Sequence, residues 1–246
     1  MGYWLVKAVL TPILRVMFRP KITGLDNVPT EGGLIMAGNH TTFVDNFMIP
    51  LLMSRRVTYV AKSDYFTGSG IKGLLQRMFF GGVGMIPIDR SGGKASEAAL
   101  QTGLRVLLEG GVMGIFPEGT RSPDGRLYRG KTGVARLALA AGVPVVPVGL
   151  VGLHRLQPAG QTIPKFGKVE IRIGKPLDFS RYAGMEDDRF VLRSITDEIV
   201  YELMVLGGQE YVDVYATQAK AEIEAAKRAG RSPEAGEEAA PARRAS

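Results

Sequence analysis

Residues 39–45, Asn-His-Thr-Thr-Phe-Val-Asp, carry the sharpest chemical pattern in the chain. They follow an apolar run that predicts a strand, and they open a segment that predicts a helix. On a regular helix His40 and Asp45 would point in different directions, so a turn must bring them together. If they meet, Asp45 accepts a hydrogen bond from one imidazole nitrogen, and the other nitrogen can take a proton from a hydroxyl group. A surface turn with an acid at a helix N-terminus is the alternative interpretation.

A second polar turn, Phe116-Pro117-Glu118-Gly119-Thr120-Arg121-Ser122, follows another predicted strand. Open α/β sheets bind ligands at the carboxyl ends of their strands. Gly119 permits a tight turn, and Arg121 offers a guanidinium fork suited to phosphate. Glu118 could orient Arg121 or accept a hydrogen bond from a substrate hydroxyl. An ordinary β-turn with a local ion pair would explain the same residues.

Two further cations stand at the ends of predicted strands. Lys62 ends the strand expected at residues 57–61, and Arg90 follows the strand expected at residues 83–88. Each could contact a phosphate group. A surface ion pair such as Asp89 with Arg90 explains the pattern equally well.

The stretch Gly125–Thr132 fits the phosphate-loop pattern G-x-x-x-x-G-K-[ST] of nucleotide hydrolases. Such a loop needs a strand directly before its first glycine, but Pro123 and Asp124 stand there. A nucleotide hydrolase is therefore a less favoured alternative. A non-catalytic lipid-binding module is another.

Composition excludes several kinds of site. The 246 residues include no cysteine, which rules out disulfides, thiolate metal sites and a cysteine nucleophile. Only His40 and His154 could supply imidazole, and His154 is interpreted as a loop residue without chemistry. The net charge of +7 favours anionic partners, namely nucleic acid, anionic lipid or phosphorylated substrates.

Strands and helices that would position these residues alternate along the middle of the chain. Strands are predicted at 33–38, 57–61, 83–88, 112–116, 145–150 and 168–173, and helices near 45–54, 70–79, 94–109, 131–141 and 186–206. This rhythm is typical of an α/β fold with a mixed, mainly parallel central sheet flanked by helices. The apolar stretch 137–153 imitates a membrane span, but its glycines and prolines favour a helix capped by Gly142 and then a buried strand.

The two ends differ from this middle part. Residues 3–18 predict an amphipathic helix, with a polar stripe at Lys7, Thr11, Arg15 and Arg19 and an apolar face at Trp4, Leu5, Val9, Ile13, Val16 and Phe18. Such a helix either packs on the core or lies in a membrane interface, and its aromatic residues favour the interface. From residue 216 the chain is rich in Ala, Glu, Lys and Arg, which predicts a helix to about Lys227 and then disorder. We therefore expect an interfacial helix at 1–21, a domain at 22–215 and a charged, largely disordered tail at 216–246.

Taken together, four ordered motifs resemble the glycerolipid acyltransferase family, which includes the enzymes that acylate 1-acyl-glycerol-3-phosphate. Residues 39–45 match the family's Asn-His-x₄-Asp motif, with Thr42 where serine is usual. The segment ending at Ile88-Asp89-Arg90 matches the second motif, residues 116–122 match the third without a change, and Val143–Gly149 match an apolar fourth. The resemblance covers roughly residues 22–180 and implies a glycerol-3-phosphate acyltransferase-like fold.

The resemblance also implies roles. His40 would deprotonate the free hydroxyl of lysophosphatidic acid, and Asp45 would hold its imidazole. Lys62, Arg90, Glu118, Gly119, Thr120 and Arg121 would bind the glycerol phosphate. The acyl donor would be a thioester of coenzyme A or acyl carrier protein, used as co-substrate, with no bound cofactor or metal. We expect a peripheral enzyme of phospholipid biosynthesis on an anionic membrane, at the cytoplasmic face of the cell membrane, without nucleic acid. Other lysophospholipids, glycerol phosphate or glycolipids remain open as acceptors, and amides near the start of the helix after His40 are one guess for the oxyanion site.

Overall fold

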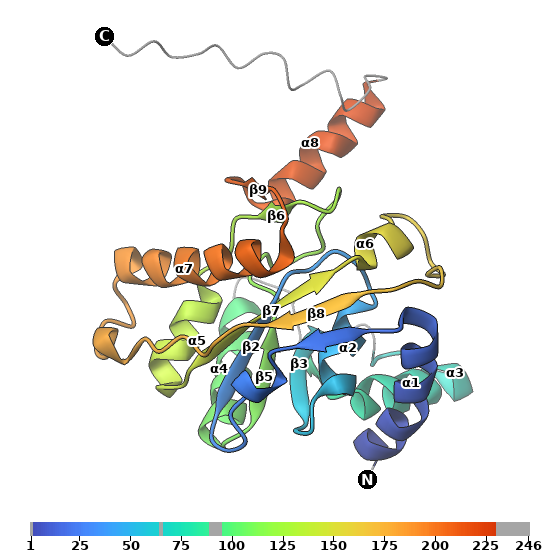
Figure 1. The fold of residues 1–246 in the computed structure, drawn as a ribbon, viewed down its shortest axis with the longest axis horizontal. Helices are drawn as coiled ribbons and strands as arrows, with labels where there is room; N and C mark the ends of the chain where they lie inside the picture. The colour runs from blue at the N-terminus through green and yellow to red at the C-terminus, as the bar shows by residue number, and fades with distance from the viewer. Residues whose placement is uncertain (1, 64–65, 89–94, 230–246) are drawn as a thin grey trace.

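A central mixed sheet organises the chain in the computed structural model, which describes residues 2–63, 66–88 and 95–229 (Figure 1). Its seven strands lie in the order β1-β8-β7-β2-β5-β3-β4. Neighbours from β7 to β4 pair in parallel, whereas β8 runs antiparallel to β7 and carries β1 on its other edge. The strands are β1 (Lys21–Thr23), β2 (Leu34–Gly38), β3 (Val57–Lys62), β4 (Met85–Ile88), β5 (Val112–Ile115), β7 (Val145–Val151) and β8 (Glu170–Ile173). The predicted α/β fold with a mainly parallel sheet is confirmed.

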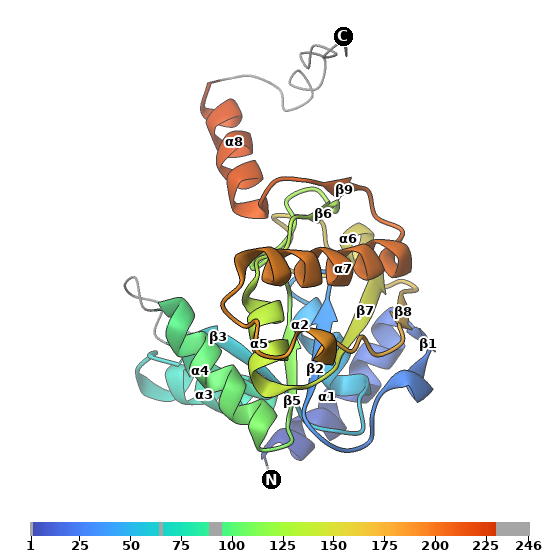
Figure 2. The ribbon, with the colours of Figure 1, turned by 90° about the vertical axis from the view of Figure 1, so that its left-hand side faces the viewer.

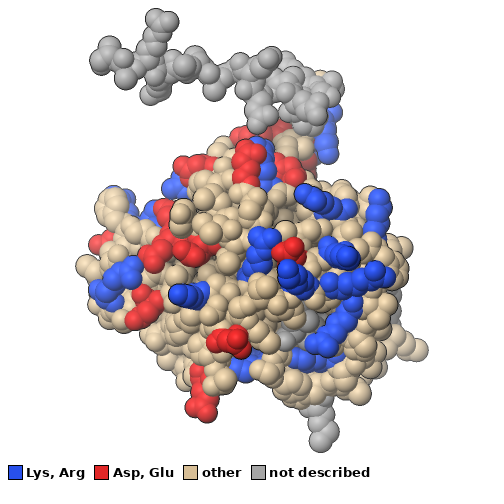
Figure 3. All heavy atoms as spheres, in the orientation of Figure 1, with Lys and Arg blue, Asp and Glu red and all other residues tan. Residues whose placement is uncertain are grey.

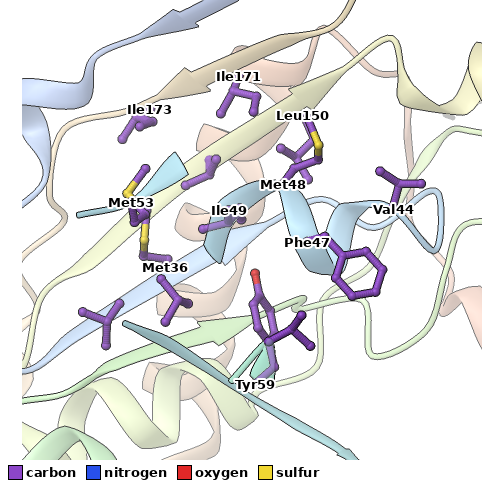
Figure 4. Close-up of a cluster of buried hydrophobic side chains, with 14 of the residues drawn as sticks. Met36, Val44, Phe47, Met48, Ile49, Met53, Tyr59, Leu150, Ile171 and Ile173 are labelled. Atoms are coloured by element: carbon purple, nitrogen blue, oxygen red, sulfur yellow. The ribbon is translucent and has the colours of Figure 1, made fainter. Parts of the chain in front are cut away.

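Helices cover both faces of this sheet (Figure 2). Leu34 and Met36 of β2 face α1 (Gly2–Phe18), α2 (Asp45–Leu52) and α3 (Gly70–Gly82). Ile35 and Ala37 point the other way, toward α4 (Ala95–Leu108), α5 (Gly133–Ala141) and α7 (Arg189–Gly207). The side chains of α2 fill the space above β2, β3 and β7 (Figure 4). A strand buried on both faces explains why residues 33–38 read as a continuous apolar run.

The N-terminal helix α1 is apolar on two sides. Val6, Leu10 and Leu14 pack on the core, and Lys7 Nζ donates to the carbonyls of Pro50 and Met53 at the end of α2. Trp4, Leu5, Val9, Ile13 and Val16 nevertheless remain exposed. One side of the helix therefore packs on the core and the other is exposed, and its membrane contact stays a prediction. Phe18, expected on the exposed apolar face, is instead fully buried, because the chain turns there toward β1.

The apolar stretch 137–153 divides as expected. Helix α5 ends at Ala141, Gly142 caps it with φ +61°, and the buried strand β7 follows. Of the helices in the described ranges, none combines the length and the apolar character that crossing a bilayer requires. His154, interpreted as a loop residue, lies in the short helix α6 (Leu153–Leu156).

A pair of two-residue strands joins the domain to helix α8. Strand β6 (Leu127–Tyr128) pairs in parallel with β9 (Tyr211–Val212), and α8 (Ala216–Arg228) follows. Ala216 and Ala219 pack against Tyr128. Helix formation to about Lys227 agrees with the prediction, whereas residues 230–246 lie outside the described residues. Two-residue strands show no readable period, so β6 and β9 were not predicted.

Candidate active site

The site lies where β2 and β5 end side by side. Their register places Ala37 beside Ile115, so His40 and Glu118 emerge next to each other, three residues beyond this pair. The helix after β2 covers one face of the sheet, and the helix after β5 covers the other. Such a divergence of connections opens a crevice at the carboxyl edge of a sheet, where α/β proteins bind ligands. Both predicted polar turns therefore meet at this edge.

His40 and Asp45 are in contact, as a catalytic dyad requires. Nδ1 of His40 lies 3.1 Å from Oδ2 of Asp45. Because an ionised carboxylate can only accept, Nδ1 carries the proton and Nε2 presents its lone pair. The imidazole is 13% exposed and the carboxylate is fully buried. Within the described residues no group bonds to Nε2, so this atom can receive a proton from a bound molecule.

The turn between the two residues wraps around the carboxylate of Asp45. Oδ2 also accepts the backbone N–H groups of Thr41, at 2.6 Å, and Thr42, at 2.7 Å, while Oδ1 accepts the Thr42 hydroxyl at 2.6 Å. These bonds fix Asp45 and hence the plane of the imidazole. The amides of Thr41 and Thr42 are therefore already used and cannot form an oxyanion site, whereas the amides at the start of α2 stay a prediction.

Aromatic rings stack beneath the imidazole. The ring of Phe116 lies 4.0 Å from that of His40 at an interplanar angle of 12°, and Tyr59 stacks behind Phe116 at 5.3 Å. This stacking fixes the plane of the imidazole against Phe116. The motif containing Phe116 was singled out in the sequence, but nothing in the spacing indicated this contact.

Glu118 is buried beneath the site, where its carboxyl group accepts hydrogen bonds from two backbone N–H groups. Its side chain is 1% exposed, Oε1 accepts the His40 N–H at 2.8 Å, and Oε2 accepts the Tyr128 N–H at 3.2 Å. Burial raises the pKa of Glu118 to about 8, more than its two backbone hydrogen bonds lower it. Glu118 was expected to bind the glycerol phosphate. Its burial favours a positioning role instead, in which it ties the His40 turn to β6.

The exposed rim of the site is cationic. Gly119, with φ +73°, turns the chain so that Thr120 and Arg121 reach the surface. A side chain at Gly119 would meet Lys131 Cδ at 3.0 Å, so Lys131 lies directly over this turn. From helix α8, Lys220 Nζ donates to Thr120 Oγ1 at 2.7 Å. Lys220 was not predicted, since no spacing in the sequence links residues 120 and 220.

Two further predicted phosphate-binding residues are Lys62 and Arg90. Lys62 ends β3 at the same edge of the sheet, but its side chain is outside the described residues, as is all of Arg90. Their phosphate contacts therefore stay predictions.

The phosphate-loop interpretation of Gly125–Thr132 is wrong, because β5 ends at Ile115 and residues 127–128 form strand β6 within the stretch. Across the described ranges, no three His, Asp or Glu side chains group to hold a metal ion.

The family model described as Acyltransferase matches residues 19–151, which hold the dyad and both polar turns. The chain belongs to this acyltransferase family. This agrees with the resemblance carried by the four sequence motifs.

Individual relatives carry a more specific name. A 1-acyl-sn-glycerol-3-phosphate acyltransferase of Bacillus subtilis is 30% identical over 176 residues, which are 71% of this chain and 81% of the relative. The chloroplastic BAT2 enzyme of that name from Brassica napus is 30% identical over 162 residues, or 65% of this chain. The chain spans only 45% of the length of this plant relative. The crystal structure of PlsC from Thermotoga maritima, titled a 1-acyl-sn-glycerophosphate acyltransferase, shares the fold with a TM-score of 0.62 and 23% identity, over 81% of this chain and 77% of that chain.

Proposed function

We propose that the protein transfers a fatty acyl group from a thioester to the free hydroxyl of 1-acyl-glycerol-3-phosphate, which yields phosphatidic acid. The observation that carries this proposal is the His40–Asp45 contact, with Nε2 unoccupied by any described residue, beside a turn bearing Arg121. A base next to a cationic rim suits an acceptor that has both a hydroxyl and a phosphate. The names of the two relatives point to the same acceptor.

The reaction is a direct transfer in this scheme. Nε2 of His40 takes the proton of the acceptor hydroxyl as its oxygen attacks the thioester carbonyl. The tetrahedral intermediate collapses, the C–S bond breaks, and the leaving thiolate takes the proton from the imidazolium. Asp45 stabilises the imidazolium between these steps. The chain has no cysteine, and this route needs no protein thiol.

Arg121 binds the acceptor phosphate in this scheme. Its side chain is exposed, and the amide of the next residue, Ser122, donates to the His40 carbonyl at 2.6 Å. A guanidinium can form two parallel hydrogen bonds to phosphate oxygens. Lys62 and Arg90 are kept as further phosphate contacts. The acyl donor is a thioester of coenzyme A or of acyl carrier protein, taken as co-substrate. Acylation of another lysophospholipid, glycerol phosphate or a glycolipid is the alternative within the family.

Helices α1 and α3 support docking on a membrane surface. The two helices lie against each other. A Cβ atom added at Gly82 would lie only 2.5 Å from Cγ2 of Val6. Together the two helices expose a set of large apolar residues, Trp4, Leu5, Val9, Ile13, Val16, Ile71, Leu74, Leu75 and Met78. Lys and Arg gather on the adjoining surface over α1, β1, β8 and α6, on the right in Figure 3. An apolar patch bordered by cations is what an anionic membrane binds. We place the protein at the cytoplasmic face of the cell membrane, bound peripherally.

The test is a thiol-release assay with purified protein. Acyl-CoA and acyl carrier protein donors are offered with a panel of lysolipids, glycerol phosphate and glycolipid acceptors. We expect thiol release that depends on lysophosphatidic acid, and a loss of at least about a hundredfold in His40→Ala. His154→Ala is the matched control, since it removes the other histidine and should keep most of the activity. Lipid binding without thiol release in the native protein would instead assign a non-catalytic lipid-binding module.

A further inference from the structure

Helix α8 brings a lysine to the candidate site from outside the part of the chain that the family model matches. The match ends at residue 151, whereas Lys220 lies on the second turn of α8. Its Nζ donates to the hydroxyl of Thr120 at 2.7 Å, across 100 residues of sequence. Thr120 stands between Gly119 and Arg121 in the turn that forms the cationic rim. Lys220 is therefore a neighbour of the proposed phosphate site.

The position of Lys220 is set by the fold. Strand β9 pairs with β6, Ala216 and Ala219 pack against Tyr128, and the guanidinium of Arg129 lies 5.6 Å from the ring centre of Tyr215. The amide of Tyr128 is bonded in turn to Glu118, which also holds the His40 amide. One chain of contacts thus connects α8 to the imidazole. Lys220 is also partly buried, which limits the space its ammonium can sample.

Positive charge accumulates here without a compensating ion pair. Lys220, Arg121 and Lys131 surround the same turn, and in the described parts of the chain none of the three lies within ion-pair distance of a carboxylate. Burial and the charge of Arg121 lower the pKa of Lys220, and the buried Glu118 offsets part of this effect. Like charges held together repel one another, so an anion bound between them would be stabilised.

We propose that Lys220 is a substrate-binding residue that, together with Arg121, holds the phosphate monoester of the acceptor lipid. The Thr120 hydroxyl, which accepts from Lys220, is thereby oriented to donate its own hydrogen to the same phosphate. This inference rests on the proposed acyltransferase function and adds to it a residue from the C-terminal helix. The expected occupant is a dianionic headgroup, since two flanking cations match its charge.

The experiment compares Lys220→Met with Lys227→Met in the full chain. Lys227 lies two turns further along α8, is exposed, and loses the same charge without touching the site. In Lys220→Met we expect the KM for lysophosphatidic acid to rise about ten- to a hundredfold, because a charge-assisted hydrogen bond is lost. The kcat and the KM for acyl-CoA should change by less than about threefold. Monoacylglycerol, which lacks the phosphate, should be used equally by the variant and the native protein.

Further arms separate the possible outcomes. Lys220→Gln keeps a donor for Thr120 without the charge and should show the same rise in KM, whereas Lys220→Arg should restore most of the affinity. A melting temperature equal to that of the native protein shows that α8 remains docked. An unchanged KM for lysophosphatidic acid in both Lys220→Met and Lys220→Gln overturns the inference. So does a rise confined to the KM for acyl-CoA, which would assign the lysine to a phosphate of the donor. Absence of thiol release in the native protein, in contrast, refutes the proposed function itself.

Discussion

Replacing Asp45 with asparagine removes the negative charge beneath His40 and leaves a side chain of almost the same size. The carbonyl oxygen of asparagine can take the place of Oδ2, which accepts from His40 Nδ1 and from the amides of Thr41 and Thr42. The new NH₂ group then faces the Thr42 hydroxyl, which can rotate to accept. The turn should therefore survive, and the variant tests charge rather than folding.

The expected loss follows from the distance between the charges. Nδ1 and Oδ2 are 3.1 Å apart, so the charge centres of imidazolium and carboxylate lie about 4 Å apart. At an effective dielectric constant of about 20, this attraction is worth about 4 kcal/mol. Because the imidazolium forms only as the hydroxyl is deprotonated, the loss falls on the transition state. We expect kcat to fall about a thousandfold, with little change in KM.

The assay for Asp45→Asn measures the thiol released from acyl-CoA with a thiol-reactive dye. The protein contributes no background, since it contains no cysteine. Asp187→Asn, an exposed position outside the site, is the matched control and should retain native activity. If Asp45→Asn melts like the native protein and keeps more than about a tenth of its kcat, the charge of Asp45 does not support catalysis.

Three further results are expected. The free energy of unfolding of the native protein should fall by up to about 5 kcal/mol as pH rises from about 4.5 to 8, because Glu118 keeps its proton until about pH 8 in the folded state but loses it near pH 4.5 when unfolded. Urea midpoints measured across this range should fall less in Glu118→Gln than in the native protein, and an equal fall in the two proteins would contradict the prediction. Arg121→Ala should raise the KM for lysophosphatidic acid at least about tenfold in steady-state assays, and an unchanged value would remove it from the phosphate site. Leu5→Glu with Val16→Glu should weaken binding to anionic vesicles at least about tenfold in co-sedimentation, with no change in melting, and equal binding would show that α1 does not contact lipid.

The main elements could be predicted because burial imposes a pattern on the sequence. Strand β2 is apolar throughout since both of its faces are covered, and Gly142 marks the end of α5 because the chain there needs a positive φ. The environment of α1 could not be settled in the same way. Periodicity shows that a helix has an apolar side, but not that Val6 packs inward while Val9 stays exposed.

The candidate site was predictable where it is local. His40 and Asp45 belong to one turn, so their types and spacing alone suggested a dyad, with a surface turn as the alternative, and the structure shows the contact. The bond from the His40 amide to Glu118 joins the turns that follow β2 and β5, and it depends on the register that sets Ala37 beside Ile115. This register is a property of the paired strands and cannot be predicted from either segment alone. The burial that turns Glu118 from an expected ligand of phosphate into a support for the backbone is likewise a property of the assembled sheet.

Helix α8 shows how a segment with a weak pattern can reach a site. Its composition predicted a charged tail, because Ala, Glu, Lys and Arg offer little apolar surface. Docking here needs little such surface from the helix, since Tyr128 supplies the large side chain and Ala216 and Ala219 need only be small enough to approach it. The four residues of β6 and β9 then fix the direction of α8, and with it the reach of Lys220 to Thr120. A truncation after residue 215 would therefore remove a cation of the proposed phosphate site and uncover Tyr128, so loss of activity in such a truncation could not be assigned to either cause without the single substitution at Lys220.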